Sequence, residues 1–73
     1  MGKIVRRKMA GMEPVMEWSA GDPASVQEAQ ELLRREIDDG FTAVHSQDGR
    51  NEPVTELPVD AELIILTTAM GGG

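Results

Sequence analysis

One apolar run near the end of the sequence, from Leu63 to Thr68, limits the folds that this chain can adopt. The run reads Leu-Ile-Ile-Leu-Thr-Thr and is apolar at four successive positions. Because neighbouring residues of a strand point to opposite faces of its sheet, such a strand is buried on both faces. It therefore belongs in the centre of a sheet. A chain of 73 residues holds one small domain, so the other elements must be arranged around this strand.

One helix is predicted between Asp22 and Gly40. Asp22 is a favoured N-cap residue, and Pro23 suits the first helical position. Ser25 and Glu28 offer an alternative capping box one turn later. Gly40 can adopt the left-handed conformation that often ends a helix. The apolar residues that recur at helical spacing are Val26, Ala29, Leu33 and Ile37.

Four further strands are predicted, over residues 3–9, 15–18, 41–46 and 53–57. Gly11 and Pro14 predict a turn between the first two strands. Asp48-Gly49 predicts a tight turn after the third, and Pro53 and Pro58 suggest that the fourth lies at an edge of the sheet.

The predicted element order is therefore ββαβββ. Pairing the first strand in parallel with the last, with the helix across one face, buries most of the apolar residues. This is a β-grasp arrangement, an α+β fold with a mixed sheet of four to five strands.

The charge distribution argues against several classes of protein. The net charge is −6, yet residues 1–8 hold four of the seven basic side chains and none of the thirteen acidic ones. So acidic a chain is a poor general binder of nucleic acid, because phosphate contacts dominate that affinity. The chain has no cysteine, which excludes disulfides, thiolate zinc sites and a cysteine nucleophile. With no apolar run long enough for a signal peptide or a membrane span, we expect a cytoplasmic protein without membrane contact.

No cluster of residues predicts catalysis or metal binding. His45 is the single histidine and has no evident triad partner. Asp38-Asp39 with Asp48 or Glu52 lacks the regular acidic spacing of a calcium loop. We therefore expect no enzymatic activity, no metal and no bound cofactor.

The last five residues, Ala69-Met70-Gly71-Gly72-Gly73, directly follow the predicted central strand. Glycine has no side chain, so an extended glycine segment can enter a narrow tunnel that a Cβ atom would block. A partner enzyme could then adenylate its terminal carboxylate. We expect one domain over residues 1–70 and a flexible tail over residues 71–73.

These features resemble the ubiquitin-like proteins, particularly the small bacterial sulfur carriers of thiamine and molybdopterin biosynthesis and the related protein modifiers. The resemblance rests on the element order and on two stretches, Val59 to Leu66 and Ala69 to Gly73. The chain departs from the sulfur carriers in having Thr67-Thr68 where they commonly have prolines, and three terminal glycines where they have two.

The resemblance implies a partner rather than an activity of the chain itself. An E1-like enzyme would use ATP to activate Gly73, for sulfur transfer or for protein conjugation, with Gly71 and Gly72 as the slender approach. A JAB-type peptidase could instead remove Gly73 and expose Gly72. Met70, Thr68 and Trp18 are the candidate docking residues, Trp18 because tryptophan is favoured at interface hot spots. For Trp18 we favour a second interpretation, in which it covers one end of the helix.

A second interpretation is also open. A β-grasp domain can serve as an interaction or assembly subunit, such as an adaptor or a phage-type structural component, with no conjugation chemistry. In that case, loss of residues 71–73 would leave function intact.

Overall fold

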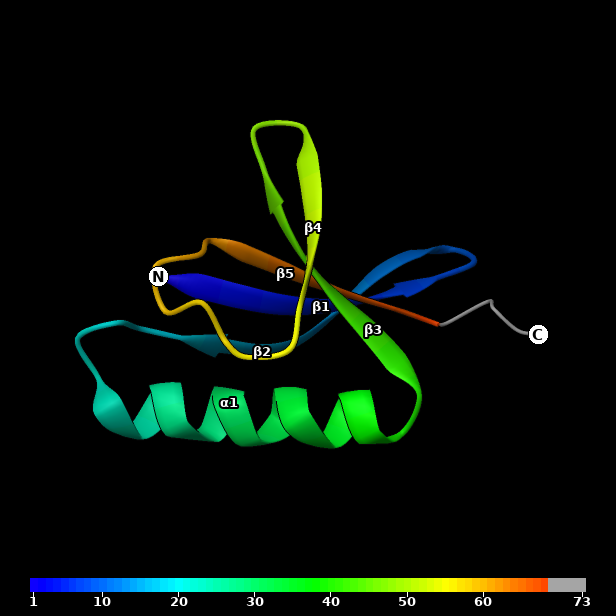
Figure 1. Cartoon of the computed structure of the whole chain (residues 1–73). Helices are drawn as coiled ribbons and strands as arrows, with labels where there is room; N and C mark the ends of the chain where they lie inside the picture. The colour runs from blue at the N-terminus through cyan, green and yellow to red at the C-terminus, as the bar shows by residue number, and fades with distance from the viewer. Residues whose placement is uncertain (69–73) are drawn as a thin grey trace.

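The computed structural model describes residues 1–68. These residues form one mixed sheet of five strands, in the order β2-β1-β5-β3-β4, with one helix across one face (Figure 1). The element order and the predicted α+β class, with one helix and a mixed sheet, are confirmed. The elements are β1 (Gly2–Lys8), β2 (Gly11–Trp18), α1 (Pro23–Asp38), β3 (Phe41–Gln47), β4 (Arg50–Val54) and β5 (Leu63–Thr68).

Strand β5 lies in the centre of the sheet, as its doubly apolar pattern predicts. It pairs in parallel with β1, Lys3–Arg6 lying against Leu63–Leu66, and antiparallel with β3. Ile64 and Leu66 are fully buried in the core beneath α1, and Ile65 is 5% exposed although it points to the opposite face. The two halves of the sheet, β1 with β2 and β3 with β4, are joined only through β5.

Helix α1 begins and ends where its capping residues predict. The Asp22 side chain accepts a hydrogen bond from the Ala24 N–H at 3.2 Å, and Gly40 has φ 105° just beyond the C-cap Asp39. The alternative capping box is wrong. The Ser25 hydroxyl bonds back to the backbone of Ser19, at the end of β2, and so joins the start of the helix to the sheet.

Two strand boundaries differ from the prediction. Strand β2 begins at Gly11 and includes Pro14, because an edge strand has one side without a partner and tolerates a residue that lacks an N–H. A register shift beside Pro14 leaves Val15 as an extra residue in β2. Strand β4 covers Arg50–Val54 rather than residues 53–57, because the tight turn at Asp48-Gly49 passes directly into the pairing of Gln47 with Arg50.

No helix within residues 1–68 combines the length and the apolar character needed to cross a membrane.

Candidate functional site

The candidate site is the end of β5, where the chain leaves the sheet. Burial falls off within two residues there: Leu66 is fully buried, Thr67 is half-buried and Thr68 is exposed. Thr68 still pairs with Phe41 of β3. The predicted terminus Gly71, Gly72 and Gly73 and the docking residue Met70 lie outside the described residues.

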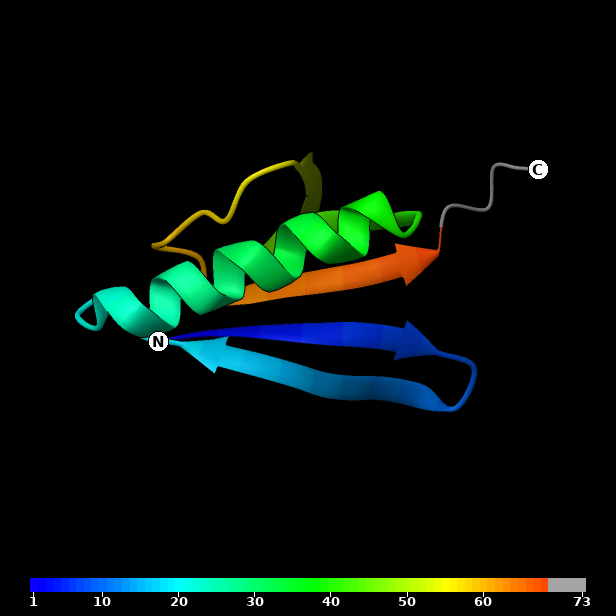
Figure 2. The ribbon, with the colours of Figure 1, turned by 90° about the horizontal axis from the view of Figure 1, so that it is seen from below.

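Two other segments lie at this end of the molecule. Because β1 and β5 are parallel, the β1–β2 hairpin projects at the same end as Thr68 (Figure 2). The end of α1 lies there too, because Phe41, which pairs with Thr68, closely follows the helix. The hairpin carries two strongly exposed apolar side chains, Met9 and Met12, the latter 50% exposed.

The charges around the end of β5 have opposite signs on its two sides. The hairpin side carries the exposed basic residues Arg7 and Lys8, of which Lys8 is paired with Glu13, whereas the helix side carries the exposed acidic residues Asp38 and Asp39. A partner that contacts both sides would therefore need a complementary, two-signed surface.

A charged cluster holds these segments in place. The Arg6 guanidinium, on β1, donates to the carboxylate of Glu36 on α1 and, at 3.4 Å, to Glu13 on β2. It also lies over the Phe41 ring, 5.2 Å from the centroid. Lys8 donates to Glu13 at 3.0 Å. The hairpin, the helix and the start of β3 are thus fastened to one another next to Thr68.

The same contacts shift two pKa values. The hydrogen bond to Glu36 raises the pKa of Arg6, with Glu13 adding to it. The hydrogen bond from Lys8 lowers the pKa of the exposed Glu13 carboxyl. Sequence reasoning missed this cluster. The one available signal was that Ile4 and Arg6 share a face of β1, which places the arginine beneath the helix.

Trp18 is buried, as expected of a covering residue, and is not an exposed docking residue. Trp18 is 2% exposed, and its indole Nε1–H donates to the backbone carbonyl of Val59 at 3.1 Å. The ring packs against Gly2, where a Cβ atom would lie only 2.1 Å from it. Trp18 is therefore a core residue that holds the β4–β5 loop against β1 and β2.

The acidic residues considered together in the sequence lie in two separate places. His45, Asp48 and Glu52 line a shallow hollow beside the β3–β4 hairpin, whereas Asp38 and Asp39 lie at the end of α1. Within residues 1–68, no group of three or more histidine, cysteine, aspartate or glutamate side chains is arranged to hold a metal ion.

Comparison with known proteins found no matching family model, no matching curated protein and no matching solved structure.

Proposed function

We propose that this chain is a ubiquitin-like carrier or protein modifier with a β-grasp fold, activated at its C-terminal glycine by an E1-like enzyme. The observation that carries the proposal is the abrupt change at the end of β5. The strand is locked in the centre of the sheet as far as Leu66, and the chain is already exposed at Thr68. Gly71 to Gly73 follow Thr68 by three to five positions in the sequence. We therefore propose that the folded domain presents this segment to the partner enzyme.

The chemistry needs no catalytic group from the chain. The terminal carboxylate of Gly73 attacks the α-phosphate of ATP, which forms an acyl adenylate and releases pyrophosphate. Sulfide or a partner's cysteine thiol then attacks the acyl carbon, and AMP leaves. The product is a thiocarboxylate in the first case. In the second it is a thioester, which can pass the acyl group to an amine.

Surfaces next to Thr68 suit the docking of the activating enzyme. Met9 and Met12 present flexible apolar side chains that adapt to a partner surface, and Arg7 adds a positive charge beside them. Together with Thr68 and Met70, these residues replace Trp18 as the proposed contacts.

The test is mass spectrometry of the intact protein isolated from its own cells. The first measurement establishes whether Gly73, Gly72 or another residue carries the terminal carboxylate. We expect either the replacement of one carboxylate oxygen by sulfur or, after proteolysis, a branched peptide linked through a terminal glycine. A free carboxylate in every preparation, with no branched peptide, would refute the proposal.

A second function, an interaction or assembly subunit without conjugation chemistry, is supported by the exposed Met9 and Met12 at the hairpin tip. Deleting residues 71–73 separates the two. The deletion abolishes the function of a carrier and leaves that of an assembly subunit intact, with Gly21→Ala as a control that alters an exposed glycine elsewhere.

A further inference from the structure

The face of the sheet opposite α1 carries an apolar cluster of its own. Val5 is 6% exposed and Ile65 is 5% exposed, yet neither belongs to the core beneath the helix. They pair with each other across β1 and β5 and point to the open face of the sheet. Both α1 and the loop of residues 55–62 pack on the other face, where Leu33 and Leu57 are part of the core. No element of the described part of the chain therefore covers this cluster.

The strand register extends the cluster into one row across the whole sheet. Residues directly opposite each other on neighbouring strands share a face. The row contains one apolar residue from each strand, in the order of the sheet: Pro14, Val5, Ile65, Val44 and Pro53. Both edge strands thus contribute a proline, which lacks the backbone donor that a further strand would need. A partner is therefore expected on the face of the sheet rather than at its edges.

The charges of this open face lie on one half of it. The strand residues Lys3, Arg7 and Glu17, on β1 and β2, are exposed there. At the corresponding positions along β3 and β4, the face carries neutral polar residues: Thr42, Ser46 and Asn51. The open face therefore has a charged half and a neutral half on either side of β5.

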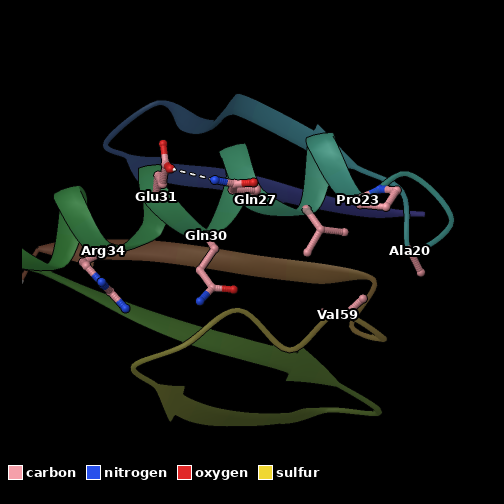
Figure 3. A pocket seen from close by; sticks show the side chains of 8 residues that line it. Ala20, Pro23, Gln27, Gln30, Glu31, Arg34 and Val59 are labelled. Atoms are coloured by element: carbon pink, nitrogen blue, oxygen red, sulfur yellow. Dashed lines mark hydrogen bonds between the residues drawn. The ribbon is translucent and has the colours of Figure 1, made fainter.

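The helix side of the domain shows no such separation. The groove between α1 and the loop that joins β4 to β5 is lined by Glu31 as well as Arg34 (Figure 3). Opposite charges thus offset one another within the lining, and the groove carries no charge that would select a partner.

We infer that the open face binds the same face of a second copy of the chain, about a two-fold axis parallel to β5. Such an axis keeps the position along the strands and exchanges the two halves of the sheet. Ile65 then faces Ile65 of the second copy, and Val5 faces Val44 of the second copy. Every charged residue of the face lies opposite a neutral polar one, in the pairs Lys3 with Ser46, Arg7 with Thr42, and Glu17 with Asn51.

The alternative two-fold axis, perpendicular to the strands, is disfavoured by charge. It would reverse the position along the strands and place Arg7 against Lys3 of the second copy. Like charges that face each other across an interface oppose association. The charge pattern therefore selects the axis parallel to β5.

The size of the face sets the strength of the dimer. Five strands at about 4.8 Å and five residues at about 3.3 Å cover about 24 by 17 Å, or about 400 Å² on each copy. The two copies together would bury about 800 Å², which is small for a specific interface. We therefore expect a dissociation constant of about 0.1–1 mM. This inference does not rest on the proposed function.

Sedimentation equilibrium of the full chain measures the association. The mean mass should be that of the monomer at about 10 μM and should approach that of the dimer at about 2 mM. Matched charge variants at Thr42 test the geometry, because Thr42 faces Arg7 of the second copy, whereas β5 separates the two residues within one chain. Thr42→Glu should tighten the dimer about fivefold and Thr42→Lys should weaken it about fivefold, since two such pairs form in each dimer.

A general effect of charge would have the opposite sign. The net charge of the chain is −6, so an added lysine would reduce the repulsion between copies and an added glutamate would increase it. The controls are Gln27→Glu and Gln27→Lys, which make comparable changes of charge at an exposed position of α1. Each should change the dissociation constant by less than about twofold.

A second pair of variants tests the apolar row. Val44→Thr should weaken the dimer about tenfold, because two apolar contacts are lost in each dimer. Val59→Thr changes an exposed valine in the loop on the other face and should leave the dimer unchanged. Circular dichroism of each variant shows whether the domain stays folded. A chain lacking residues 71–73 should associate equally, so this test and that of the proposed function can fail separately.

Three results would overturn the inference. The first is a monomeric mass at every concentration up to about 2 mM. The second is tighter association of Thr42→Lys than of Thr42→Glu. The third is an equal effect of Val44→Thr and Val59→Thr on the dissociation constant.

Discussion

Replacing Gly2 by alanine should destabilise the domain far more than a change of one methyl group suggests. Gly2 pairs with Trp18 across β1 and β2. A Cβ atom on Gly2 would lie 2.1 Å from Cζ2 of the indole, 2.3 Å from Cε2 and 2.4 Å from Cη2. The ring is 2% exposed and is enclosed by the core. Either the indole or the end of β1 must therefore move.

The cost has two parts. Overpacking a filled core costs about 1–3 kcal/mol, and weakening the hydrogen bond from the indole to Val59 adds about 0.5–1.5 kcal/mol. We expect a loss of about 3 kcal/mol, compared with a total stability of roughly 4–11 kcal/mol for a domain of this length. The midpoint of thermal unfolding should fall by roughly 12–24 °C.

Urea unfolding followed by Trp18 emission and by far-ultraviolet circular dichroism measures this loss. Gly21→Ala is the control, because no atom lies within 4 Å of a Cβ built there; its stability should stay within about 0.5 kcal/mol of the parent chain. If Gly2→Ala unfolded at the same urea concentration as Gly21→Ala, the reasoning would be refuted. The end of β1 would then yield to the new methyl group at no cost.

Three further changes test other contacts. Glu36→Ala removes the main partner of Arg6. The free energy of unfolding should fall by about 1.5–3 kcal/mol, because Glu36 is 8% exposed and accepts a charged hydrogen bond. Thermal unfolding measures the loss, and an unchanged midpoint would contradict a stabilising role for the pair. Lys8 lowers the pKa of Glu13 in the folded state, so the stabilisation is present at neutral pH and is lost as the pH falls below the ordinary value of 4.5. When the pH is lowered from neutral to about 3, the free energy of unfolding of Glu13→Gln should therefore fall by less than that of the parent chain. Urea unfolding at the two pH values measures both changes. Asp22→Ala removes the N-cap and should cost about 1 kcal/mol, and Asp22→Asn, which keeps an acceptor, should restore most of it.

The parts of the fold that could be predicted from the sequence are those with a local signal. The doubly apolar run from Leu63 to Thr68 predicted the central strand, and Asp22 and Gly40 predicted the helix ends. Strand β2 was predicted too short, because Pro14 ordinarily interrupts a strand. What permits it here is the edge position of β2, and that position depends on the tertiary arrangement rather than on neighbouring residues.

In the candidate site, too, only the features with a local sequence signal could be predicted. The glycines were evident in the sequence because composition alone marks them. The bond between Arg6 and Glu36 joins residues 30 positions apart, and the one between Trp18 and Val59 joins residues 41 apart, so no spacing rule could reveal either. The docking interpretation of Trp18 could not be dismissed from the sequence for that reason. Its burial depends on Gly2, which makes room for the ring.

The parallel pairing of β1 with β5 also has a mechanical consequence. A load applied between Gly2 and Thr68 pulls the two strands from opposite ends, because they run in the same direction. The hydrogen bonds between Lys3–Arg6 and Leu63–Leu66 would then share the force in shear instead of opening one at a time. Within the sheet the two halves are hydrogen-bonded only through β5, so rupture requires this ladder to break together with the contacts of Arg6 to Glu36 and Phe41. A load applied at Thr68 would thus meet its main resistance in the strand on which it acts.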